Sequence, residues 1–181
     1  MVVGRGTVDH PTHEVPGSET WPCDHRPMND DLALIEEFPP TAEGRLMTDF
    51  AFVERAGLEI LHVERGRVVL RLPLEPHVNH VGISYAGALF TLAEVPGGVL
   101  FMSAFDVTRF YPVVGEVNIR FTAPTRGPAL VDARMSEEEI ERVASDLESS
   151  GKARWVLSHS LFDEEGNQVA TAEGTYFGLA F

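Results

Sequence analysis

Cations are scarce in this chain of 181 residues, which has 14 lysine and arginine residues against 28 aspartate and glutamate residues. The resulting net charge of −14 repels phosphate groups, so neither a nucleic acid nor a membrane surface is expected as a partner. The single cysteine, Cys23, excludes an internal disulfide and fits a reducing compartment, the cytoplasm. No apolar run approaches the ~18 residues of a membrane span, and no secretory signal is visible at the N-terminus.

Motifs for metals and cofactors are missing as well. The histidines and the cysteine near the N-terminus have none of the spacings of standard zinc sites, and the other histidines form no convincing metal set. No glycine-rich loop of the Walker or dinucleotide-binding type occurs. The sequence therefore predicts neither a bound metal nor a cofactor.

What is present indicates one domain with a tail. Residues 1–28 are rich in proline and glycine, which predicts a flexible arm, and residues 29–181 are expected to form a single domain. A short helix is expected over residues 29–38, where two prolines follow and end it. A second helical stretch opens near Thr41 and should stop at Gly57.

After Gly57 the apolar residues alternate, which predicts a hairpin over residues 58–74. A central helix is expected from about Ser84 to about Ala104. Pro96 lies inside it and cannot donate to the carbonyl of the residue four positions earlier. Two outcomes are therefore expected with equal weight: a kink or break just after Glu94, or a helix end at residues 96–98.

The second half of the chain predicts strands and one more helix. An apolar stripe and a capping pattern at Ser136 and Glu139 predict a helix between Ser136 and Gly151. The order of elements predicts an α+β fold. The expected strands cover residues 113–123, 129–135, 154–162 and 168–177.

The stretch HVNHVGISYAGALFTLAEVPGG carries the chemistry. In it, Asn79 and Glu94 lie fifteen residues apart, with Gly87 between them. A turn here delivers the N-terminus of a helix, whose free N–H groups can polarise a carbonyl and hold an oxyanion. A carboxylate further along the helix can activate water or attack directly. These groups are what hydrolysis of a thioester needs.

This stretch resembles the hotdog-fold acyl-CoA thioesterases of the phenylacetate-pathway type. The resemblance rests on the Asn79 to Gly82 turn, the helix start Tyr85-Ala86-Gly87, and Glu94. A second match is the strand Glu116–Pro124. The resemblance implies the hotdog fold, in which an antiparallel sheet wraps around a long central helix, here with N-terminal helices and an extra helix between strands. It also implies that the substrate is an acyl thioester of coenzyme A or of acyl carrier protein.

The resemblance further assigns roles to residues. Glu94 would be the nucleophile or general base, Asn79 would orient the water or the thioester carbonyl, and the N–H of Gly87 would polarise that carbonyl. The protein would be a homodimer, or a dimer of dimers, in which Asn79 and Gly87 of one subunit face Glu94 of the other. The strand Val113–Ala123 would lie at the seam. Substrate contacts are expected from His80, Gly82, Tyr85, Arg120 and Thr122.

An anionic carrier also needs local cations, and the nearest in sequence are Arg109, Arg120, Arg126 and Arg134.

Departures from the family pattern leave other functions open. Tyr85 replaces the usual histidine of the helix start, and Val114 stands where some relatives have serine or threonine. One alternative is a non-catalytic module that binds an acyl thioester or a lipid in the same pocket. Another is a hotdog dehydratase, because His80 precedes Glu94 by fourteen residues, close to the spacing of the histidine and glutamate pair in those enzymes.

Overall fold

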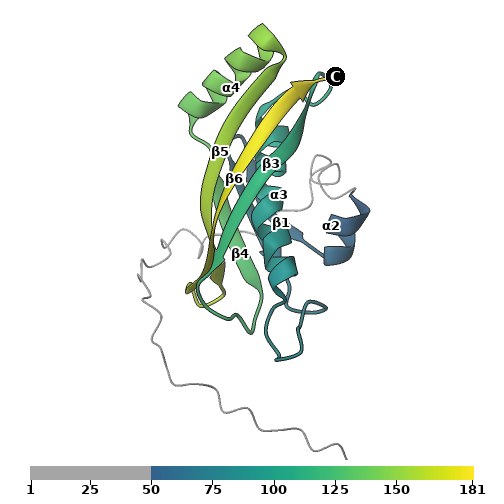
Figure 1. Cartoon of the computed structure of the whole chain (residues 1–181), viewed down its shortest axis with the longest axis vertical. Coiled ribbons are helices and arrows are strands. Elements are labelled where there is room, and N and C mark those ends of the chain that lie inside the picture. The colour runs from purple at the N-terminus through teal and green to yellow at the C-terminus, as the bar shows by residue number, and fades with distance from the viewer. Residues whose placement is uncertain (1–49) are drawn as a thin grey trace, which may run out of the picture.

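Six antiparallel strands wrap around one long helix in the computed structural model, which describes residues 50–181 (Figure 1). The arm expected over residues 1–28 and the helix expected over residues 29–38 lie outside the described residues. In chain order the elements are α2 (Ala51–Ala56), β1 (Glu59–Glu64), β2 (Arg67–Leu72), α3 (Ala86–Ala104), β3 (Phe110–Phe121), β4 (Ala129–Arg134), α4 (Glu137–Ser150), β5 (Lys152–Asp163) and β6 (Gln168–Ala180).

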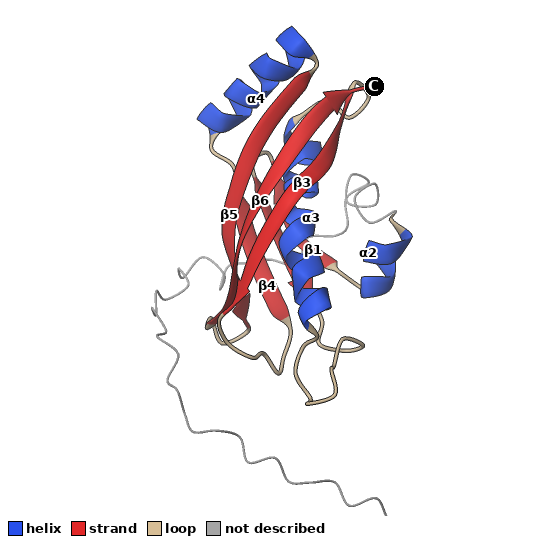
Figure 2. Ribbon diagram, in the orientation of Figure 1, coloured by secondary structure: helices blue, strands red, loops and turns tan. Residues whose placement is uncertain are grey.

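The strands form a single sheet in the order β1-β2-β4-β5-β6-β3. Figure 2 shows β5, β6 and β3 side by side in this sheet. Every neighbouring pair is antiparallel. β3 is therefore an edge strand: it pairs with β6 on one side, and no strand of residues 50–181 pairs with its other side. The predicted α+β class and the predicted sheet around a central helix are confirmed.

α3 forms the core of the domain, and the sheet curves around it (Figures 1 and 2). The helix continues through Pro96 as far as Ala104, so the predicted helix end at residues 96–98 is wrong. Buried side chains on α3, such as Leu92 and Leu100, meet buried residues of the strands. This packing supports the helix across a residue that would break an exposed one.

α3 is long and apolar enough to cross a membrane by length and composition alone, which differs from the expectation that no apolar run approaches that length. In this fold it is the central helix, and Leu92 and Phe101 on it are fully buried. Its apolar character is that of a core helix, which the sheet covers.

Two predicted helix boundaries are confirmed. Gly57 ends α2 in the left-handed conformation with φ 62°. The helix between Ser136 and Gly151 is α4, where the Ser136 hydroxyl accepts a hydrogen bond of 3.2 Å from the Glu139 N–H. Its predicted apolar stripe of Ile140, Val143 and Leu147 is buried against the sheet.

Candidate functional site

The turn before α3 is built around Asn79. Its side-chain oxygen accepts hydrogen bonds from the N–H groups of Val81 at 2.9 Å and Ile83 at 3.3 Å. Its own backbone bonds to Ile83 and Gly82 close the turn, with Gly82 at φ 79°. The side-chain oxygen is therefore engaged within the turn, and the Asn79 NH₂ group is what remains to donate to a ligand.

The start of α3 offers two main-chain donors. No side chain caps the helix. The N–H of Tyr85 donates to His77, and those of Ala88 and Leu89 donate to the Tyr85 carbonyl. Among the described residues, the N–H groups of Ala86 and Gly87 have no acceptor. They add to the positive end of the helix dipole, so this end of α3 can bind a polarised carbonyl or an oxyanion.

Position 87 has no room for a side chain. The Tyr85 ring, which is 60% exposed, lies over it, and a Cβ atom at position 87 would come within 2.5 Å of the ring. The predicted substrate contact at Tyr85 is thus a ring that covers the helix start.

A cavity of about 410 Å³ adjoins this turn. The predicted residues Asn79 and Thr122 line it, together with Ala86 at the helix start. The Thr122 hydroxyl donates to the carbonyl of Gln168, so its proton is used to join two strands. The predicted contact His80 is exposed and does not line this cavity. We call this region the turn half-site; it contains Asn79, Ser84, Ala86, Thr122 and Thr125.

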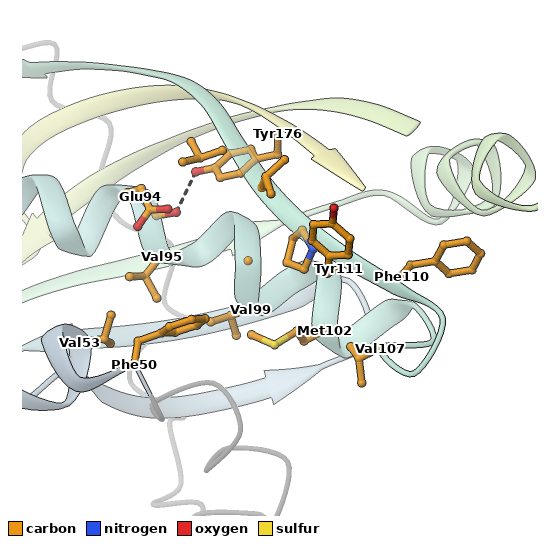
Figure 3. A pocket seen from close by; sticks show the side chains of 14 residues that line it. Phe50, Val53, Glu94, Val95, Val99, Met102, Val107, Phe110, Tyr111 and Tyr176 are labelled. Carbon is orange, nitrogen blue, oxygen red and sulfur yellow. Dashed lines mark hydrogen bonds between the residues drawn. The ribbon is translucent and has the colours of Figure 1, made fainter. Parts of the chain in front are cut away.

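Glu94 lies in a different cavity, which has a volume of about 560 Å³ (Figure 3). Its carboxyl group is partly buried, and this burial raises the pKa of Glu94 above the ordinary value. In the part of the chain that the structure describes, Glu94 forms no ion pair and is the one charged residue lining the cavity. We call this region the carboxylate half-site; the side chains around Glu94 include Phe50, Val53, Val95, Val99, Met102, Tyr111, Val113 and Val114.

Tyr176 of β6 also lines the carboxylate half-site, and nothing in the sequence pointed to it. Its hydroxyl donates a hydrogen bond of 2.9 Å to the main-chain carbonyl of Glu94 (Figure 3). Burial, and then the Glu94 carboxylate, raise the pKa of Tyr176, while the Gly97 main chain offsets part of this rise. The residue lies 82 positions after Glu94, so no local pattern could have paired them.

The two half-sites of one chain are separate cavities that share no lining residue. Glu94 lies seven positions after Gly87 on α3, a rise of about 10 Å along the helix axis. Catalytic groups must approach the reacting atoms to about 3 Å. The structure thus brings Asn79 and Thr122 together and separates them from Glu94.

The cations expected near a carrier group differ in availability. Arg109 forms a two-pronged ion pair with Glu148, and Arg134 pairs with Asp132. The predicted contact Arg120 lies in a third, polar cavity beside Ser158 and Glu173, and it lines neither half-site.

Arg126 follows Thr125 of the turn half-site in the chain and lies near Gly82 of the turn. Its guanidinium lies about 4.0 Å from where a Cβ atom of Gly82 would stand, and it has no ion pair within residues 50–181.

The fold places this protein in the hotdog thioesterase-like superfamily. More particularly, residues 45–177 match the domain of unknown function DUF4442, and the chain belongs to that family. No curated protein matches the chain.

Solved structures show the same fold. A Pseudomonas aeruginosa protein of unknown function, called a probable thioesterase, is 40% identical and superposes with a TM-score of 0.73 over 81% of this chain and 99% of its own. A protein of unknown function from Chlorobaculum tepidum has 23% identity and a TM-score of 0.67, over 76% of this chain and 91% of its own. A thioesterase from Haemophilus influenzae has 14% identity and a TM-score of 0.62, over 81% of this chain and 94% of its own.

Proposed function

We propose that this protein is an acyl-thioester hydrolase that works as a homodimer. The observation that carries the proposal is the position of the two half-sites at opposite ends of one open edge strand. Val113 and Val114, near the start of β3, line the carboxylate half-site, whereas Phe121, at its end, lines the turn half-site. Each half-site holds one part of the groups that thioester hydrolysis needs.

Antiparallel pairing of β3 with its copy would join complementary halves. In such a pair, the first half of one strand lies beside the second half of the other. Glu94 of one protomer would then approach Asn79 and Gly87 of the partner. β3 suits this role because it is long, its outer edge is open among the described residues, and Val113 and Val114 on it are exposed.

The chemistry follows from this arrangement. The N–H groups of Ala86 and Gly87 polarise the thioester carbonyl and then hold the oxyanion. Glu94 acts as the general base on the attacking water, and its raised pKa moves it towards the range in which a base is effective. The apolar lining of the carboxylate half-site receives the acyl chain.

The carrier is coenzyme A or acyl carrier protein, whose phosphate groups need a cation. Arg126 is the candidate because it is free of ion pairs within the described residues and lies over the turn. The acidic net charge makes this local cation the more important, since the rest of the surface repels an anionic carrier.

A panel of acyl-CoA thioesters, with release of the thiol as the readout, tests the function. We expect hydrolysis by the wild type and a loss of about 10²–10⁴ in rate for Glu94→Gln, which keeps the shape but removes the base. Ser103→Ala is a matched control on α3, because its hydroxyl bonds only within the helix and lies outside both half-sites.

Other outcomes select the alternatives. Saturable binding without turnover, unchanged in Glu94→Gln, would indicate a binding module. Hydration or dehydration of the acyl chain that fails in both His80→Ala and Glu94→Gln would indicate a dehydratase. Light scattering that shows a monomer at micromolar concentration would contradict the shared site.

A further inference from the structure

The ring of Tyr176 is closely packed on several sides. It is 1% exposed, and its ring stacks on Trp155 with the centroids 5.7 Å apart. Glycines flank the ring on both sides: a Cβ atom at Gly97 would come within 2.1 Å of it, and one at Gly174 within 2.5 Å. Neither position has room for a side chain without a shift of the ring.

The Tyr176 hydroxyl has a single proton, and one hydrogen bond already uses it. That proton goes to the main-chain carbonyl of Glu94 at 2.9 Å, so the hydroxyl cannot also donate to the Glu94 carboxylate. A hydroxyl oxygen has two acceptor lone pairs. This oxygen can therefore accept a hydrogen bond from a donor in the cavity that Tyr176 lines.

The carboxylate half-site therefore presents two acceptors side by side in apolar surroundings. One is the Glu94 carboxylate and the other is the Tyr176 hydroxyl oxygen, which faces it (Figure 3). A molecule with two donor hydrogens on one oxygen satisfies both acceptors, and water is the simplest such molecule.

We propose that Tyr176 is a further catalytic residue, whose hydroxyl accepts one hydrogen of the attacking water while Glu94 accepts the other. This inference rests on the proposed hydrolase function. The water oxygen, held at both hydrogens, has its remaining lone pairs free for the thioester carbonyl carbon. As the carbon–oxygen bond forms, one water proton passes to Glu94. The carbon–sulfur bond then breaks, the proton passes to the departing thiolate, and the products are a carboxylic acid and a thiol.

Methanol as a competing acyl acceptor tests this role. Methanol has one hydroxyl hydrogen, which Glu94 can take, and its methyl group would stand where the water hydrogen meets Tyr176. Tyr176→Phe removes the acceptor and replaces it with an apolar edge. We expect hydrolysis to fall about 3- to 10-fold, the effect of losing one hydrogen bond, while the ratio of methyl ester to free acid rises by a similar factor.

Controls separate this role from a structural one. A loosened cavity would lower hydrolysis and methanolysis together and leave the product ratio unchanged, and that result would overturn the proposal. Ser103→Ala also removes a hydroxyl that donates to a carbonyl of α3, at 2.8 Å, and should keep the wild-type rate and ratio.

If Tyr176→Phe does not fold, 3-fluorotyrosine at position 176 keeps the shape and the donor but weakens the acceptor, and the ratio should still rise. An unchanged ratio in that variant would also overturn the proposal. Absence of hydrolysis in the wild type would instead refute the hydrolase function itself, and this inference with it.

Discussion

Gly97 and Gly98 are neighbours in α3 whose replacement by alanine should have opposite effects on stability. A Cβ atom at Gly98 meets nothing within 4 Å, because this residue faces the carboxylate half-site. Gly98→Ala should therefore gain the full helix propensity difference, about 0.5–1 kcal/mol. For a chain of this size, that gain corresponds to a rise of about 1–4 °C in Tm.

Gly97→Ala gains the same propensity but meets the ring of Tyr176. The new Cβ atom would stand 2.1 Å from the ring, which also stacks on Trp155. Overpacking of this kind costs about 1–3 kcal/mol, so the net effect should be a loss of up to about 2 kcal/mol. The difference between the two variants removes the propensity term and isolates the overlap.

Urea unfolding followed by circular dichroism, at one protein concentration for all variants, gives both free energies of unfolding. We expect Gly98→Ala to be more stable than the wild type and Gly97→Ala to be less stable, with a gap of about 1–3 kcal/mol. Equal stability of the two variants would refute the contact between α3 and Tyr176 on which the site depends.

Three further predictions concern charge. Burial raises the pKa of Glu94, so the folded state binds its proton more tightly than the unfolded state. Glu94→Gln should therefore stabilise the protein at pH 7. In urea titrations, this gain should vanish as the pH falls below the ordinary carboxyl pKa. Burial lowers the pKa of His159 from 6.5 to about 4, so protonation of the unfolded state should cost the wild type up to about 3 kcal/mol between pH 6.5 and pH 4. His159→Gln should lack this acid sensitivity in the same titration. Arg126→Ala should raise KM for an acyl-CoA thioester but not for the matching N-acetylcysteamine thioester, which has no phosphate; equal changes in KM would exclude a phosphate contact.

The sequence predicted those parts of the fold that depend on local patterns. Gly57 and Gly151 both end helices with positive φ, and the Ser136 cap opens α4 as expected. Strand positions were also close, although β3 begins at Phe110 and β5 at Lys152, before the expected starts at 113 and 154. Strand ends depend on the partner strand, which the sequence pattern alone does not identify.

The candidate site was predictable only in its two local pieces. Asn79, Gly87 and Glu94 belong to one stretch, and a turn followed by a helix places them in order. Their separation into two half-sites depends on helix length and on the course of β3, and Tyr176 reaches Glu94 from 82 residues away. Such contacts follow from sheet topology and not from spacing in the chain.

Just after Glu94, α3 contains three successive residues with poor helix propensity. Proline inside a helix costs about 3 kcal/mol and each glycine about 1 kcal/mol relative to alanine, yet Pro96, Gly97 and Gly98 follow in succession. Each has a use in this structure. Gly97 admits the Tyr176 ring, and Gly98 leaves the cavity open. Pro96 has no N–H for the Leu92 carbonyl, so the helix relies at this point on packing against the sheet. Helix propensity is therefore poorest beside the cavity that contains Glu94. Such a departure is expected where function rather than stability determines the residues.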